Sequence, residues 1–175
     1  MGTLLPEVAS RTLYSVEYTL RGDRAAADFS GLFADLVRCE TRLYNALGDR
    51  LRERHGIVTS QYEFLSYLRD HPGCRVADLA AEFAIGVGAT SKGIDRLEKQ
   101  GWAARRPNPA DRRSSLLALT DDGARLVQEA ERTFTAGLAE LLAGTLDTPS
   151  LSAVARALST LRSALEDDQV GTPSG

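Results

Sequence analysis

Four arginines and one acid lie within nine residues near the middle of the chain: Arg105, Arg106, Asp111, Arg112 and Arg113. Guanidinium groups at this density are typical of a phosphate-binding surface, because each keeps its charge and presents several donors. Short strand candidates at 103–105 and 116–119 flank the run, and two prolines mark the loop between them. The pattern predicts a cationic β-hairpin that probes phosphates and the minor groove of DNA.

Amphipathic helices are the elements that must position this hairpin. Apolar residues recur at intervals of three and four over about 28–54, 60–70, 76–83 and 89–100 before the hairpin, and over 121–142 and 148–165 after it. The order helix, helix, helix, helix, hairpin, helix, helix predicts a mainly α fold. Its middle, residues 57–120, is predicted to be a winged helix–turn–helix DNA-binding lobe.

The flanking helices carry apolar stripes too long for so small a middle lobe to cover. Exposed stripes of this size indicate a partner surface, and a two-fold homodimer is the simplest partner. We therefore expect residues 28–54 and 121–167 to form a helical dimerisation lobe. Residues 1–27 fit either a strand or a helix, and are expected to be an N-terminal extension of uncertain order.

The composition fits one globular protein that binds nucleic acid locally. The 175 residues are 43% hydrophobic and carry a net charge of −3, yet residues 75–115 hold eight Lys/Arg against five Asp/Glu, so the remainder is at −6. A merely solvated arginine turn is the alternative. No transmembrane run or signal peptide is visible, which predicts a cytoplasmic protein without membrane contact. Two histidines, and cysteines without metal-ligand spacing, predict neither an enzyme nor a metal site or cofactor.

The chain resembles the MarR family of bacterial transcription regulators over roughly residues 28–166. The residues that carry the resemblance are Asp95-Arg96-Leu97-Glu98-Lys99-Gln100-Gly101-Trp102, Asp111-Arg112-Arg113 with Leu119-Thr120, His71-Pro72-Gly73, and Val76-Ala77-Asp78-Leu79-Ala80. The resemblance implies an obligate homodimer, two wings, a palindromic operator in double-stranded DNA and a small-molecule pocket where the lobes join. The function it implies is a ligand-responsive repressor.

The predicted helix at 89–100 would enter the major groove, and its N-terminal half would point at base edges. That places Thr90, Ser91 and Lys92 near DNA; Thr90 and Ser91 are equally good candidates for helix caps, whereas Lys92 matches a basic position of the family. Arg96, one turn further on, could reach a phosphate or pair with Asp111. Gly93 makes this helix either soft or able to pack closely.

The family pattern also assigns roles within the hairpin. It implies that Asp111 braces the wing and that Arg113 enters the minor groove, where a narrow A·T-rich groove attracts arginine. Arg106 and Arg112 are expected to contact phosphates.

An effector site is implied by the family rather than by spacing. Polar residues expected to face the join between the lobes are Arg38, Arg42, Tyr44, His55, Tyr62 and Tyr67. Cationic and phenolic groups together suit a small aromatic or phenolic anion. Two alternative functions stay open: a redox-sensing regulator that uses Cys39 or Cys74, and a winged-helix protein-interaction module that does not bind DNA.

Overall fold

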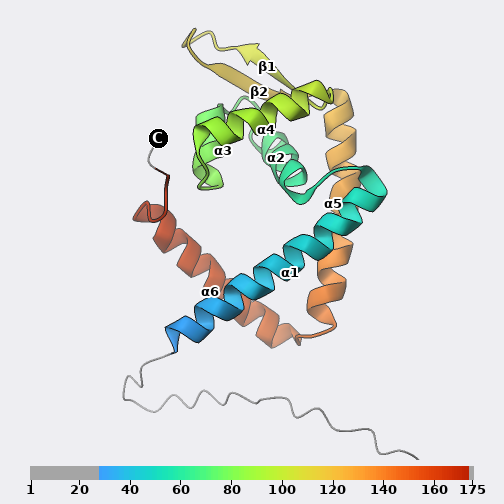
Figure 1. The fold of residues 1–175 in the computed structure, drawn as a ribbon, viewed down its shortest axis with the longest axis vertical. Coiled ribbons are helices and arrows are strands. Elements are labelled where there is room, and N and C mark those ends of the chain that lie inside the picture. The colour runs from blue at the N-terminus through green and yellow to red at the C-terminus, as the bar shows by residue number, and fades with distance from the viewer. Residues whose placement is uncertain (1–27, 174–175) are drawn as a thin grey trace, which may run out of the picture.

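The computed structural model describes residues 28–173, so the N-terminal extension predicted at 1–27 lies outside the described residues. The elements in chain order are α1 (Phe29–His55), α2 (Thr59–Asp70), α3 (Val76–Glu82), α4 (Val87–Lys99), β1 (Ala103–Pro107), β2 (Ser115–Leu119), α5 (Asp121–Ala143) and α6 (Thr148–Asp167). The predicted mainly α fold with a small hairpin is confirmed (Figure 1).

Caps that the sequence carries set the ends of several helices. The Asp28 side chain accepts from the Gly31 N–H at the start of α1, and Gly56, at φ 68°, ends that helix in the left-handed region. α4 begins at Val87, two residues before the predicted start, with Gly86 as its N-cap. The prediction was late because two glycines weaken the periodic signal there. Gly88 is tolerated in the first turn, where it meets no neighbouring atom.

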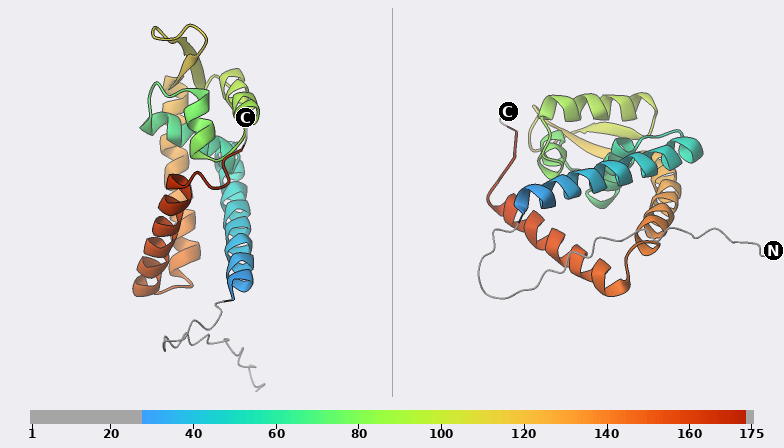
Figure 2. Two further views of the ribbon diagram at one scale, coloured as in Figure 1. Left: turned by 90° about the vertical axis from the view of Figure 1, so that its left-hand side faces the viewer. Right: turned by 60° about the horizontal axis from the view of Figure 1, so that its bottom comes forward.

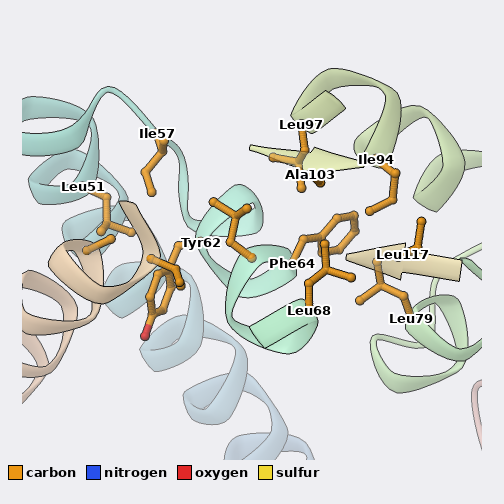
Figure 3. Close-up of a cluster of buried hydrophobic side chains, with 13 residues drawn as sticks. Leu51, Ile57, Tyr62, Phe64, Leu68, Leu79, Ile94, Leu97, Ala103 and Leu117 are labelled. Carbon is orange, nitrogen blue, oxygen red and sulfur yellow. The ribbon is translucent and has the colours of Figure 1, made fainter. Parts of the chain in front are cut away.

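One hydrophobic core joins the helices to the hairpin (Figure 3). Its largest fully buried apolar members come from α2, α3, α4 and β2, from the loop before α2, and from the long helices α1 and α5: Leu51, Ile57, Leu65, Leu68, Leu79, Ile94, Leu97, Leu117 and Val127. Burying each of these side chains contributes about 1.5–3 kcal/mol to the stability of the fold. Because the core includes residues of α2, α4 and β2, it holds α4 in place against these two elements.

Hydrogen bonds and one close approach hold the hairpin in place. β1 and β2 are antiparallel, with Arg105 opposite Leu117. On the other edge of β2, Leu117 donates to the Cys74 carbonyl (2.8 Å), so the segment before α3 adds a third, short pairing. Where β2 leads into α5, a Cβ on Gly123 would lie 1.9 Å from the Trp102 carbonyl oxygen. Only glycine therefore allows the first turn of α5 to lie so close to the residue before β1.

The hairpin lies at one end of the molecule, and the start of α1 and the connection between α5 and α6 lie toward the other end (Figures 1 and 2). The first half of α1 extends away from the winged lobe, and α6 has no buried residue (Figure 1). Their exposed large apolar side chains are Phe29, Leu32, Phe33, Leu36, Val37, Val154, Leu158, Leu161 and Leu165. Among the described residues, no helix is both long and apolar enough to cross a bilayer.

Candidate nucleic-acid interface

α4 has an apolar inner face that seats it on the core. Ile94 and Leu97 are fully buried, and Gly93 lies against the ring of Phe64, where an added Cβ would be 2.6 Å from Cε2. The structure therefore favours the close-packing explanation of Gly93 over a soft helix. A side chain at this position would push α4 away from α2.

The outer face of α4 is basic. Lys92, Arg96 and Lys99 are exposed, lie at intervals of four and three, and so form one stripe along the helix, called here the basic stripe. In the described part of the chain none of the three makes an ion pair. Lys99 was not among the predicted contacts, although its spacing of seven from Lys92 was a readable signal.

Thr90 is a correction to the predicted DNA contacts. Its side chain is fully buried and its hydroxyl donates to the Gly86 carbonyl (3.1 Å), because the position falls on the inner face with Ile94. It therefore supports the first turn of α4 and cannot reach a base. Ser91 is half-buried, and its hydroxyl oxygen accepts from the Arg105 guanidinium (3.2 Å).

The turn of the hairpin, residues 108–114, is organised by side chains. Asn108 accepts from the Ala110 N–H (3.0 Å) and donates to the Ser114 hydroxyl (2.9 Å). Asp111 accepts from the Arg113 N–H (2.9 Å), so its carboxylate braces the turn through the backbone. The alternative pairing of Arg96 with Asp111 is not formed.

The exposed arginines of the hairpin sit on and beside this braced turn. Arg106, Arg112 and Arg113 are exposed, and none is in an ion pair within residues 28–173. Arg105 differs, because it forms ion pairs with Glu98 and with Asp95 of α4. The run of four hairpin arginines therefore supplies three free cations, not four.

The six predicted effector residues do not gather in one place. Arg38 and Arg42 are exposed on the first half of α1, whereas Tyr62 is buried and stacks on Phe134 at 4.6 Å. His55 contacts the Thr133 hydroxyl (2.7 Å).

The two remaining tyrosines lie on different helices, Tyr44 on α1 and Tyr67 on α2. Tyr67 stacks on His71 at 4.1 Å. Tyr44 lines a hollow of about 290 Å³ between α1 and α2, together with Asn45, Asp49 and Arg52. A second hollow, of about 360 Å³, lies between α2 and α4 and is lined by Phe64, Gly93, Arg96 and Leu97 among others. Helical period alone does not say which partner helix faces each side chain, so an effector site at these six residues stays a prediction.

The two cysteines have different surroundings. Cys39 is exposed on α1, and Cys74 is partly buried. Burial raises the pKa of the Cys74 thiol, with a smaller contribution from Asp78. A raised pKa keeps this sulfur as the unreactive thiol at neutral pH, so the redox alternative has little support from Cys74.

A helix–turn–helix formed by α3 and α4, followed by a cationic hairpin, defines a winged helix–turn–helix protein. The sequence model of the MarR family matches residues 55–114. MarR of Salmonella typhimurium, a multiple antibiotic resistance protein, is 30% identical over 106 residues, which are 57% of this chain and 74% of that protein. The chain belongs to the MarR family of transcriptional regulators, which are not enzymes.

Other relatives agree with this assignment. The organic hydroperoxide resistance transcriptional regulator of Bacillus subtilis is 32% identical over 90 residues, covering 51% of this chain and 58% of that protein. Two MarR family regulators of Streptomyces coelicolor share the fold with a TM-score of 0.71 and 22% identity. The match to AbsC spans 83% of this chain and 99% of the AbsC chain. The match to Sco3205, which was solved in complex with DNA, spans 79% of this chain and 92% of the Sco3205 chain. The predicted family is thereby confirmed.

Proposed function

We propose that this regulator binds double-stranded DNA with α4 in the major groove and the hairpin, here called the wing, against the minor groove. The observation that carries the proposal is the basic stripe of α4 on the end of the molecule that also bears the wing, with its exposed Arg106, Arg112 and Arg113. A helix of this kind fits the major groove, and unpaired cations are the groups that phosphates attract. Residues 57–120 would form the DNA-binding lobe.

Selection from a random DNA pool tests this proposal. We expect enrichment of an inverted repeat, and an affinity that falls steeply with salt because several phosphates are neutralised together. The control is the charge-removed variant Lys92→Met/Arg96→Met, whose side chains are exposed, so folding is retained. No enrichment from the pool at low ionic strength would favour the protein-interaction module instead.

The apolar end of the molecule supports a homodimer. Nine exposed large apolar side chains on α1 and α6 would be covered by a second copy, so residues 28–54 and 121–167 would form the dimerisation lobe. Two-fold pairing presents two recognition helices, which predicts half-sites about one helical turn apart. Sedimentation should show a dimer for the wild type and for Ser159→Glu, and a monomer for Leu161→Glu, which places a charge on the apolar stripe of α6.

The hollow between α2 and α4 supports an effector-controlled repressor. Its lining combines the apolar Phe64 and Leu97 with the cation Arg96, the chemistry that holds a small aromatic anion. Arg96 also belongs to the basic stripe, so an anion bound there would withdraw a DNA contact and lower operator affinity. The regulator would then repress by occupying a promoter until the effector releases it.

A panel of benzoates tests the effector, with thermal shift for binding and fluorescence anisotropy for DNA release. We expect at least one hydroxybenzoate to raise the melting temperature and to weaken DNA binding. The matched control is Lys99→Met, which removes a cation of the same stripe outside the hollow and should keep the response. If the melting temperature stays unchanged across the panel, the proposal of an aromatic anion as effector is wrong. The proposal that the protein binds DNA is not affected by that result.

A further inference from the structure

A second stripe of α4 lies on the flank of the helix that contacts the wing. Ser91, Asp95 and Glu98 lie at intervals of four and three, the same spacing as the basic stripe but one residue earlier along the helix. Two of the three are acids, on the helix that is proposed to approach DNA phosphates. Their charges need an explanation, because like charges brought together at an interface weaken binding.

Arg105 of β1 gathers all three of these side chains. Its guanidinium pairs with the Glu98 carboxylate and with Asp95 (2.8 Å), and it donates to the Ser91 hydroxyl and carbonyl (3.2 and 3.3 Å). The Arg105 backbone N–H also donates to Glu98 Oε1 (2.7 Å). Arg105 is thus the point where the root of the wing is attached to the flank of α4.

The position of Arg105 on its strand explains why it differs from its neighbour. Arg105 is opposite Leu117 in the hairpin, so the two share the face that packs on the lobe. Arg106, one residue on, belongs to the other face and is exposed. The Arg105 side chain is only 25% exposed and both of its terminal guanidinium nitrogens have partners, whereas Asp95 is 60% exposed. Without Arg105, that carboxylate would stand unneutralised beside the basic stripe.

We propose that Arg105 is a positioning residue: it clamps the wing onto the recognition helix and neutralises Asp95 and Glu98, and it does not itself bind DNA. This inference rests on the proposed DNA binding, but the clamp can be tested without DNA. It assigns Asp95 and Glu98 a role as well, since they set the place of the wing relative to α4. The planar fork of arginine suits this task, because one side chain reaches three partners.

The first experiment needs no DNA. Amide hydrogen exchange of the free protein is compared for the wild type, Arg105→Met and Arg106→Met. We expect Arg105→Met to speed exchange at least fivefold in residues 103–119, while global unfolding by urea keeps a single transition. Arg106→Met, which removes the same charge one position along the same strand, should leave these rates unchanged. Equal rates in all three proteins would overturn the clamp, whatever the DNA result.

The second experiment measures affinity for the selected operator in a mutant cycle. Arg105→Met should weaken binding about tenfold, the scale of one good contact. Adding Asp95→Asn and Glu98→Gln should recover most of that loss, because the two exposed carboxylates are then gone. The control for general charge adds Asp95→Asn and Glu98→Gln to Arg106→Met. Less affinity should be recovered in this background, because Arg105 is still present and the two changes remove its ion pairs.

The salt dependence separates positioning from direct contact. Each lost phosphate contact lowers the slope of log K against log salt by about 0.9. The proposal is wrong if Arg105→Met makes the slope of log K against log salt less steep by that amount and Asp95→Asn/Glu98→Gln restores no affinity. Arg105 would then be a phosphate contact. A wild type that binds no DNA would refute the proposed function, and the exchange rates would still decide on the clamp.

Discussion

Gly93 offers the sharpest test of how α4 is held. Replacing glycine by alanine inside a helix adds about 0.5–1 kcal/mol of stability through the unfolded chain and helix propensity. At Gly93, however, the new Cβ would lie 2.6 Å from Phe64 Cε2 and 3.3 Å from Cδ2, distances at which something must shift. Phe64 cannot retreat freely, because its ring is 8% exposed and stands 5.4 Å from the Phe83 ring.

Overpacking of a core costs about 1–3 kcal/mol. The clash at Phe64 should therefore outweigh the helix gain, and we expect Gly93→Ala to lower the free energy of unfolding by about 1 kcal/mol. Gly88→Ala is the matched control in the same helix: nothing lies within 4 Å of its Cβ, so we expect a gain of up to about 0.5 kcal/mol.

Urea unfolding at fixed protein concentration, followed by circular dichroism and Trp102 fluorescence, measures both changes; concentration is fixed because a dimer's stability depends on it. Phe64→Leu makes room, so in that background the cost of Gly93→Ala should shrink by about 1 kcal/mol or more. If Gly93→Ala stabilises the protein as much as Gly88→Ala does, the close-packing argument is wrong and Gly93 merely softens the helix.

Three shorter predictions concern the wing, a helix cap and the cysteines. Arg113→Ala should weaken operator binding by about 1–3 kcal/mol, measured by anisotropy, and unchanged affinity would remove Arg113 from the interface. The Arg75 side chain holds the pKa of the Asp78 carboxyl below its ordinary value of 3.8. Its ionised form therefore stabilises the fold above that value and this contribution is lost as the pH falls through the lowered pKa. Asp78→Asn should thus cost about 0.5 kcal/mol at pH 7 and nothing in strong acid, as acid and urea titrations can check. Alkylation with iodoacetamide at pH 7 should modify the exposed Cys39 well before Cys74, whose pKa is raised by burial; the reverse order would restore Cys74 as a redox candidate.

The sequence predicted the elements well because the signals for them are local. Apolar periodicity is read within each helix, and the caps that the structure shows at Asp28, Gly56 and Thr120 also lie within one turn of the helix ends that they fix. The bracing role of Asp111 was implied by the family resemblance, and the hydrogen bond that the structure shows, from the Arg113 N–H to its carboxylate, is also local. The contacts between elements were harder. Thr90 was expected either to contact DNA or to cap the helix, because the sequence does not show that its position falls on the inner face of α4 with Ile94.

The effector residues show a different limit. Tyr62 and Tyr67 both carry phenols on α2, yet one stacks on Phe134 of α5 and the other on His71 after the helix ends. Their separation by five residues places them on different flanks of the helix, and only the tertiary packing says what each flank meets. The hollow between α2 and α4 is lined by Phe64 and Gly93 among others, and the periodicity of the polar residues gave no signal for it.

The net charge of −3 does not argue against DNA binding once the charges are placed. Three successive stripes of α4, each displaced by one residue, separate its tasks: Thr90, Ile94 and Leu97 are buried, Ser91, Asp95 and Glu98 meet the wing, and Lys92, Arg96 and Lys99 face solvent. The acids of the middle stripe are paired with Arg105, so they subtract little from the field of the solvent-facing cations. Exposed charges more than about 10 Å apart are largely screened at ordinary ionic strength, so the charges next to a bound phosphate matter more than the sum over the chain. Within the described residues, Arg106, Arg112 and Arg113 of the hairpin are exposed and make no ion pair, so their charges are available although the whole chain carries a net charge of −3.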